Sequence, residues 1–257
     1  MPQTAVRIIG DPSASGPLVI TCEHASNRVE PPLLADLDDC RWLDSHWGWD
    51  IGAAAVSEEL ARLSNSVGVL ADFSRLVCDP NRDPTDATWI RTEVEGSALG
   101  FNAGIDEAER IRRLRRYYDP YHHVVDSVLG ERLAHSGDVL LLSVHSFTPH
   151  FGTESRSMEV GILFADYEPV ARRLAAQLDQ EGFVVALNEP YSGLEGLIFA
   201  ANRHGREHGV IYLEIELRQD LIGTASDAIA VAGKVWRALD RLRLRRMPRE
   251  TVAKATR

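Results

Sequence analysis

Two histidines of this chain follow apolar runs and carry side chains suited to binding a metal. His24 ends the run "LVITCEH" and His145 ends "LLLSVH", and small polar residues come after each. A single histidine after a strand is usually structural, but two on strands that can be neighbours favour a shared role. Neutral imidazole is the commonest protein ligand of zinc, and a catalytic zinc site takes three protein ligands and one water. The pair therefore predicts a site for Zn²⁺, or another divalent metal, with a third protein ligand.

Three residues are candidates for this third ligand. Asp50 lies in "DSHWGWDIGAAA", at the predicted start of a helix, from which its carboxylate can reach over the edge of a sheet; its alternative role is an N-cap. Glu23 is adjacent to His24 and therefore points to the opposite face of a strand. Asn27 is near enough, but a neutral amide is a poor zinc ligand. We expect His24, His145 and Asp50 to hold the metal.

The last apolar run, "YLEIELRQD", carries charged residues at alternate positions. Glu214, Glu216 and Arg218 therefore share one face of the predicted strand, and buried charges are costly unless that face is a functional site. A glutamate beside a metal-bound water can act as a general base and then as an acid toward the leaving amine. We assign this role to Glu216. An ion pair between Arg218 and either glutamate is an alternative that is compatible with the same role.

The segments "FSRLV" and "DPNR" offer groups that bind carboxylates. Arg82 can hold a substrate carboxylate in a bidentate fork, and Asn81 can add a further donor. Arg75 can do the same or can pair with Asp79. We expect Arg75, Asn81 and Arg82 to bind the substrate, with Arg218 as a further candidate.

Two further histidines and a tyrosine stand in polar or aromatic contexts. His122 lies in "YYDPYHHVV", His204 in "FAANRHGREHG", and Tyr191 follows "VVALNEP". Either histidine could bind an oxyanion or a substrate acid group, and either could cap a helix end. We expect His204 to assist catalysis and His122 and Tyr191 to contact the substrate.

These residues must be positioned by a sheet, because most of them follow short apolar runs. The near-continuous hydrophobicity of the runs is typical of strands covered on both faces. Helical patterns alternate with them, which predicts an α/β fold, a three-layer α/β/α sandwich with a mixed central sheet. Ligands of open α/β sheets bind beyond the carboxyl ends of the strands, where the polar residues fall. The predicted strands are 17–24, 66–79 (two strands or one bent strand), 137–147, 158–165, 182–189 and 209–217, and the predicted helices are 50–65, 105–137 (interrupted near Pro120), 167–182 and 226–246.

Composition narrows the functional classes. The 257 residues suit a single domain over residues 1–246, followed by a flexible tail at 247–257. We find neither an apolar run of about 18 residues nor a secretory signal, so we expect a cytoplasmic protein without a membrane partner. The net charge of −10 disfavours nonspecific binding to nucleic acid. Three irregularly spaced cysteines predict reduced thiols. We expect Cys22 to be a buried residue of the core and not a nucleophile.

Motifs of several other enzyme classes are missing from the sequence. It has no GxSxG elbow of a serine hydrolase, no GxxxxGK[ST] phosphate loop and no GxGxxG dinucleotide motif.

Six ordered blocks resemble the N-formylglutamate amidohydrolase family over residues 17–222. They are "ITCEHASN", "FSRLVCDPNRDP", "YYDPYHHVV", "LLLSVHSFTP", "NEPYSG" and "EIELRQDLI". The first block places the chain nearer to a branch with "EHASN" than to the deformylase branch with a "PHSG"-like block. The resemblance implies a phosphorylase/hydrolase-like fold shared with zinc carboxypeptidases and aspartoacylases.

Local similarities within these blocks carry over to individual residues. "ELR", Glu216 to Arg218, is similar to the carboxypeptidase segment with the catalytic glutamate, and "DPNR", Asp79 to Arg82, is similar to the aspartoacylase "DLNR". Those relatives use a His-x-x-Glu metal pair, whereas here the third position after His24 is Asn27. The resemblance therefore implies a third ligand from elsewhere, such as Asp50, or weaker metal binding.

The motifs and the resemblance together predict a zinc-dependent amidohydrolase. Its substrate would be a small molecule, an acidic amino acid with an N-acyl group, such as N-formylglutamate. One alternative is a hydrolase of another N-acyl amino acid or of a peptide-like amide. The other is a non-catalytic protein that binds a metal or ligand on the same scaffold.

Overall fold

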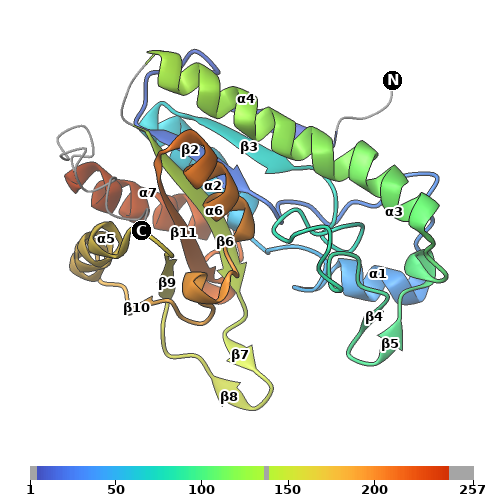
Figure 1. Ribbon diagram of the computed structural model, residues 1–257. Coiled ribbons are helices and arrows are strands. Elements are labelled where there is room, and N and C mark those ends of the chain that lie inside the picture. Colours follow the sequence, from blue (N-terminus) through green and yellow to red (C-terminus); the bar gives the residue numbers. More distant parts are fainter. Residues whose placement is uncertain (1–4, 136–138, 243–257) are drawn as a thin grey trace.

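The computed structural model describes residues 5–135 and 139–242 (Figure 1). Within them, a seven-stranded mixed sheet forms the centre of the protein, as predicted. Its central strands β3, β2, β6 and β11 are parallel; β1 lies antiparallel beside β3, and β9 and β10 run antiparallel to β11 at the other edge. In spatial order the strands are β1 (Val6–Ile9), β3 (Val67–Ala71), β2 (Leu18–Cys22), β6 (Leu140–Phe147), β11 (Ile211–Arg218), β9 (Val160–Leu163) and β10 (Val185–Leu187).

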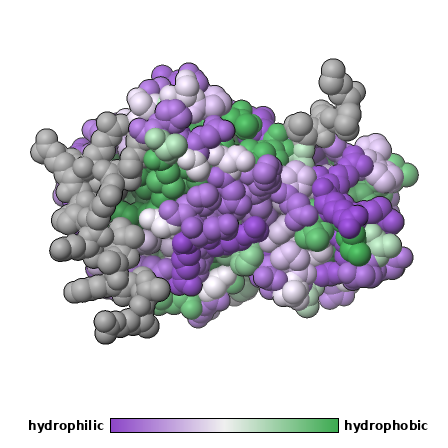
Figure 2. All heavy atoms as spheres, turned by 45° about the horizontal axis from the view of Figure 1, so that its top comes forward, coloured by the Kyte–Doolittle hydropathy of each residue, from purple (hydrophilic) through white to green (hydrophobic). Residues whose placement is uncertain are grey.

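Helices cover both faces of this sheet and give three layers (Figure 1). One face packs against α4 (Asp119–His135) and α6 (Phe199–His208). The other face packs against α2 (Ala53–Ser64) and α5 (Glu168–Gln180), and α7 (Ala225–Arg241) lies against both of these helices. The outer surface on the α4 side is mainly hydrophilic (Figure 2). Because both faces of the sheet are covered, every residue of β2, β3 and β6 is buried, and β2 and β3 are almost wholly apolar.

The predicted helical region 105–137 passes its proline without a break. It consists of α3 (Glu107–Arg113), a π-helical turn η2 (Leu114–Tyr118) and α4. Pro120 has no N–H to donate to an earlier carbonyl, and the π-helical turn immediately precedes α4 at this point. The short edge strand β1, helix α1 (Leu37–Leu43) and helix α6 were not predicted.

The prediction of strand structure through residue 79 was wrong. Only β3 is a strand, and the chain then enters turns, in which the Val77 N–H donates to the Ser74 carbonyl. Leu76, Val77 and Cys78 are nevertheless buried in the core. The apolar run signalled burial, which turns can achieve when side chains and neighbouring carbonyls satisfy their backbone groups.

Two-residue strands and short 3-10 helices lie in the loops that connect the main elements. The hairpin of β7 and β8 extends beyond β6 (Figure 1). Within the described part of the chain, no helix is long and apolar enough to cross a membrane. The predicted tail, residues 247–257, lies outside the described residues. The small elements are β4 (Glu93–Val94), β5 (Ser97–Ala98), β7 (His150–Phe151), β8 (Glu154–Ser155), η1 (Gly100–Asn102), η3 (Gly193–Glu195) and η4 (Gln219–Leu221).

Candidate active site

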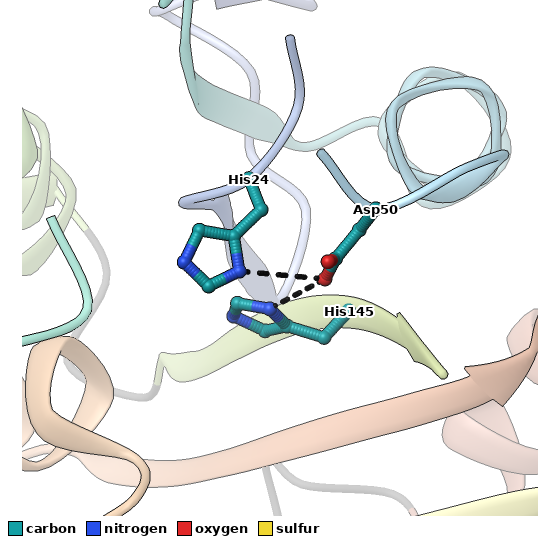
Figure 3. A group of neighbouring side chains, drawn as sticks. All are labelled: His24, Asp50 and His145. Carbon is teal, nitrogen blue, oxygen red and sulfur yellow. Dashed lines mark hydrogen bonds and ion pairs between the residues drawn. The ribbon is translucent and has the colours of Figure 1, made fainter. Parts of the chain in front are cut away.

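The three predicted metal ligands lie together at the carboxyl ends of β2 and β6 (Figure 3). Nδ1 of His145 is 2.8 Å from Oδ2 of Asp50, and Nδ1 of His24 is 3.5 Å from the same oxygen. All three side chains are buried. Two ring nitrogens and a carboxylate therefore face one point.

Asp50 owes its position to backbone contacts. Its N–H donates to the His24 carbonyl at 2.9 Å, and its carboxylate accepts from the Ser146 N–H at 3.1 Å. The N-cap of α2 is Gly52, whose φ of +84° suits glycine and whose added Cβ would lie 2.4 Å from the Ile222 carbonyl oxygen. Asp50 is therefore not the N-cap, and its carboxylate is available to the histidines.

A second carboxylate contacts the outer nitrogen of each histidine ring. Nε2 of His24 lies 2.7 Å from Oδ1 of Asp79, and Nε2 of His145 lies 3.0 Å from Oε2 of Glu23. Glu23 also accepts hydrogen bonds from Tyr121 and Ser143. Such outer partners fix the orientation of a ligating imidazole and the nitrogen that it presents to a metal.

The expectation that Glu23 faces away from the site was wrong. Strand β2 ends at Cys22, so the alternation of faces no longer governs the next residue. Asn27 lies apart from the cluster, because its amide donates to Asp44 at 2.9 Å. Of the three third-ligand candidates, Asp50 is the one whose carboxylate lies between the inner nitrogens of both histidines.

Two glutamates of β11 complete the buried cluster. Glu214 and Glu216 are paired in register with Ser143 and His145 of β6. Oε2 of Glu214 lies 3.6 Å from Nε2 of His145, whereas Oε2 of Glu216 is buried without a hydrogen-bond partner among the described residues. Burial raises the pKa of Glu214 to about 7 and that of Glu216 well above its usual range. Glu216 is therefore a carboxyl group that can hold a proton near neutral pH.

The cluster brings five buried carboxyl groups together. The acidic members among the described residues are Glu23, Asp50, Asp79, Glu214 and Glu216. Burial opposes ionisation of Glu23, but the hydrogen bond and charge of His145, together with hydrogen bonds from Ser143 and Tyr121, outweigh burial and lower its pKa to about 2. Burial likewise lowers the pKa of His145, but the surrounding carboxylates outweigh it and raise that pKa.

The donor set fits a divalent metal. Nδ1 of His24 makes no hydrogen bond within the described residues, although it is buried and faces Asp50. Two imidazoles and one carboxylate are the ligand types of catalytic zinc sites.

A pocket of about 260 Å³ opens onto this cluster. Four predicted substrate-binding or site residues, Arg75, Asn81, Arg82 and Tyr191, line it together with the metal-site residues. The sequence reasoning missed a further group of pocket residues, although two of them stand in the same segment as Asp50. The missed residues are His46, Trp47, Arg91, Ser146, Phe147, Thr148, Phe151, Leu197 and Gln219.

The predicted arginines of the pocket are partly committed to the protein's own carboxylates. Arg75 lies 3.1 Å from Asp79 and 3.5 Å from Asp50. Arg82 lies 3.6 Å from Asp79 and 3.5 Å from Asp86. These pairs hold both guanidinium groups at the pocket wall.

Three predicted site residues do not line the pocket. Arg218, the last residue of β11, pairs with Asp220 at 2.8 Å and donates to backbone carbonyls of residues 156–158. His122 and His204 lie between α4 and α6, where Nδ1 of His122 is 2.8 Å from Nε2 of His204. Nδ1 of His204 is in turn 2.6 Å from Asp126. The geometry therefore supports a structural role for the two histidines.

The thiols do not take part in the site. Cys22 is fully buried, as predicted, and burial raises its pKa. Cys22, Cys40 and Cys78 are all free. A buried thiol with a raised pKa is a poor nucleophile, so the cluster does not have the chemistry of a cysteine hydrolase.

The mixed α/β/α sandwich places buried histidines and carboxylates beyond the carboxyl ends of its strands, where ligands of open α/β sheets bind. The family model of N-formylglutamate amidohydrolase matches residues 16–223. The chain belongs to this family, as its sequence blocks predicted, and is an enzyme that hydrolyses linear amide bonds.

Solved structures share the fold of this chain. A gene product from Agrobacterium tumefaciens matches with 31% identity and a TM-score of 0.84, over 94% of this chain and 97% of its own. An N-formylglutamate amidohydrolase from Ralstonia eutropha shares the fold at 20% identity, with a TM-score of 0.74 over 95% of this chain and 99% of its own. No curated protein matches the sequence significantly.

Proposed function

We propose that this enzyme is a metal-dependent amidohydrolase that removes the N-acyl group, formyl in the simplest case, from an acidic amino acid such as N-formylglutamate. The observation that carries the proposal is the convergence of two histidine Nδ1 atoms on Asp50, beside the unpartnered carboxyl oxygen of Glu216. Membership of the family supports the amide chemistry.

His24, His145 and Asp50 would hold Zn²⁺ or another divalent ion. Such an ion, when bound, supplies polarisation of the acyl carbonyl and lowers the pKa of a water. Asp79 and Glu23 would accept the outer ring N–H groups and so hold each imidazole with Nδ1 facing inward.

Glu216 would transfer the proton. Its carboxylate takes a proton from the attacking water as the oxygen bonds to the acyl carbon, and then delivers this proton to the amide nitrogen as the C–N bond breaks. The products are a carboxylate, formate in the formyl case, and the free amino acid. A raised pKa suits this role, because the group must both accept and release a proton near neutral pH.

The pocket wall supports an acidic substrate. Arg75 and Arg82 stand on the pocket lining with their positions fixed by Asp79, and Tyr191 contributes an aromatic ring to the same lining. Guanidinium groups held in this way suit the binding of carboxylates.

The test combines metal analysis with hydrolysis of N-formyl and N-acetyl derivatives of glutamate, aspartate and glutamine. We expect about one divalent ion per chain. We expect Glu216→Gln to lower kcat by about 10²- to 10⁴-fold while metal content is kept. Glu214→Gln, its neighbour on the same strand face, is the matched control and should cost less.

Two outcomes separate the parts of the proposal. If no divalent metal co-purifies or restores activity, and Glu216→Gln hydrolyses amides normally, the mechanism is wrong. If His145→Ala loses the metal and Asp50→Ala retains it, only the choice of third ligand is wrong.

A further inference from the structure

Arg91 is a pocket arginine whose guanidinium has no ion-pair partner among the described residues. It lines the pocket, and its guanidinium stacks on Trp47 at 5.4 Å from the ring centroid. Among the described residues, this guanidinium makes no hydrogen bond or ion pair. Arg75 and Arg82, by contrast, both contact Asp79.

The surroundings of Arg91 favour an anionic ligand. Burial, followed by the positive charges of Arg75 and Arg82, lowers its pKa. The guanidinium groups of Arg75, Arg82 and Arg91 therefore lie near one another. Arg75 forms an ion pair with Asp79, and Arg82 forms ion pairs with Asp79 and Asp86. Stacking on an aromatic face leaves the N–H edge of a guanidinium free for bidentate binding of a carboxylate.

The other unassigned arginine near the pocket differs from Arg91. Arg156 also stacks on aromatic rings, those of Phe147, Phe151 and Tyr191. Its guanidinium, however, donates to the Thr148 carbonyl at 3.2 Å. At least one N–H group of Arg156 is therefore already hydrogen-bonded, whereas no guanidinium N–H of Arg91 is bonded to a described residue.

Burial places Arg91 on the outer part of the pocket. Arg91 and Trp47 are partly exposed, whereas Glu216 and Asp50 are buried. The reacting amide must lie at the buried end, beside the general base. A group bound by Arg91 therefore lies away from the bond that is cleaved.

We propose that Arg91 binds the substrate carboxylate farther from the scissile amide and thereby selects N-acyl acidic amino acids over neutral ones. This inference rests on the proposed function and adds to it the residue that determines specificity. Arg75, which lies 3.5 Å from Asp50, remains available beside the reacting centre.

The experiment compares Arg91→Gln and Arg91→Lys with the wild type on N-formylglutamate and its neutral counterpart N-formylglutamine. We expect Arg91→Gln to lower kcat/KM for N-formylglutamate by about 10- to 100-fold, mainly through KM. The value for N-formylglutamine should change by less than about threefold, since a neutral side chain gains little from the guanidinium. Arg91→Lys should retain part of the preference, because it keeps the charge without the planar fork.

Arg41→Gln is the matched control for the loss of a stacked positive charge. Arg41 stacks on Trp42 at 4.7 Å but is not among the residues that line the pocket. We expect this variant to keep the wild-type ratio of the two kcat/KM values. An equal loss on both substrates in Arg91→Gln would contradict the proposal.

Calorimetric binding of the same two compounds separates this inference from the proposed function. If the wild type binds N-formylglutamate more tightly than N-formylglutamine and Arg91→Gln removes that difference, the inference holds even where hydrolysis is absent and the proposed function fails. If the wild type hydrolyses N-formylglutamate but Arg91→Gln keeps the full preference, Arg91 is not the selective residue. Equal or absent binding of both compounds by the wild type would also overturn the assignment.

Discussion

At the scale of single residues, the capacity of the site to bind a metal depends on which ring nitrogen of each histidine faces Asp50. In both His24 and His145, Nδ1 faces Asp50 and Nε2 faces another carboxylate. The outer carboxylates, Asp79 and Glu23, are buried and further held by hydrogen bonds. A buried carboxylate on one ring nitrogen favours the tautomer that leaves the other nitrogen free as a ligand.

Glu23→Gln tests this arrangement. The amide can keep some hydrogen bonds, but it loses the charge that orients and polarises the His145 ring. We expect metal affinity to fall by about 10- to 100-fold, as measured by competition with a chromophoric chelator. Glu159→Gln is the control, because Glu159 accepts from the Val184 N–H and lies outside the pocket lining. Wild-type affinity in Glu23→Gln would show that Glu23 does not support His145.

At the scale of elements, the side chain of Asn81, which lies in a loop, connects α6 to strand β11. Oδ1 of Asn81 accepts from the Ala200 N–H in the first turn of α6, at 2.9 Å. Its Nδ2 lies 3.4 Å from both the Leu197 carbonyl and Glu214. The N-cap residue of α6, Ile198, provides no side-chain cap of its own. Asn81 therefore replaces a local cap and joins the helix to the site.

Asn81→Ala should consequently affect both stability and activity. We expect a loss of about 1–2 kcal/mol in the free energy of unfolding and about a tenfold fall in kcat/KM. Thr224→Ala is the matched control, since Thr224 caps α7 through the Asp227 N–H. It should cost about 1 kcal/mol in urea unfolding and leave kcat/KM unchanged. If both variants lose only stability, Asn81 has no role in positioning the site.

At the scale of the whole molecule, a histidine pair between α4 and α6 makes stability depend on pH. Burial, then the charge of His204, lowers the pKa of His122 from its usual 6.5 to about 3. The unfolded chain therefore binds this proton more tightly than the folded chain does. The contribution of His122 to the free energy of unfolding is therefore complete above about pH 6.5, and it is lost as the pH decreases toward 3.

His122→Asn should reduce this acid sensitivity. Between pH 7 and pH 5, the wild type should lose about 1–2 kcal/mol more of its free energy of unfolding than the variant does. Denaturant titrations of both proteins at the two pH values measure the difference, and other titrating groups cancel in the comparison. An identical pH dependence would show that His122 titrates alike in the folded and unfolded chains.

Predictions from the sequence were most accurate where local spacing determines structure. Apolar runs located the strands that carry His145 and Glu216, and helical periodicity located α2, α5 and α7. They failed at residues 72–79, because hydrophobicity reports burial and turns can be buried as well as strands. They also failed at Glu23, which stands just beyond the end of β2, where the alternation of faces no longer holds. They failed at Arg218, the last residue of β11, because its long side chain bonds Asp220 and the carbonyls of residues 156–158 instead of lining the pocket.

The sequence by itself determined the family and the layered fold class, and it selected three candidate metal ligands that the structure places together. It could do so because ordered motifs and strand-end positions are properties of short segments. The tertiary structure alone decided that Glu23 and Asp79 contact the histidines, that His122 and His204 lie outside the pocket, and that Arg91 lines the pocket without an ion-pair partner in the described part of the chain. Each of these depends on packing between segments that are distant in the chain, and such contacts leave no periodicity or spacing in the sequence.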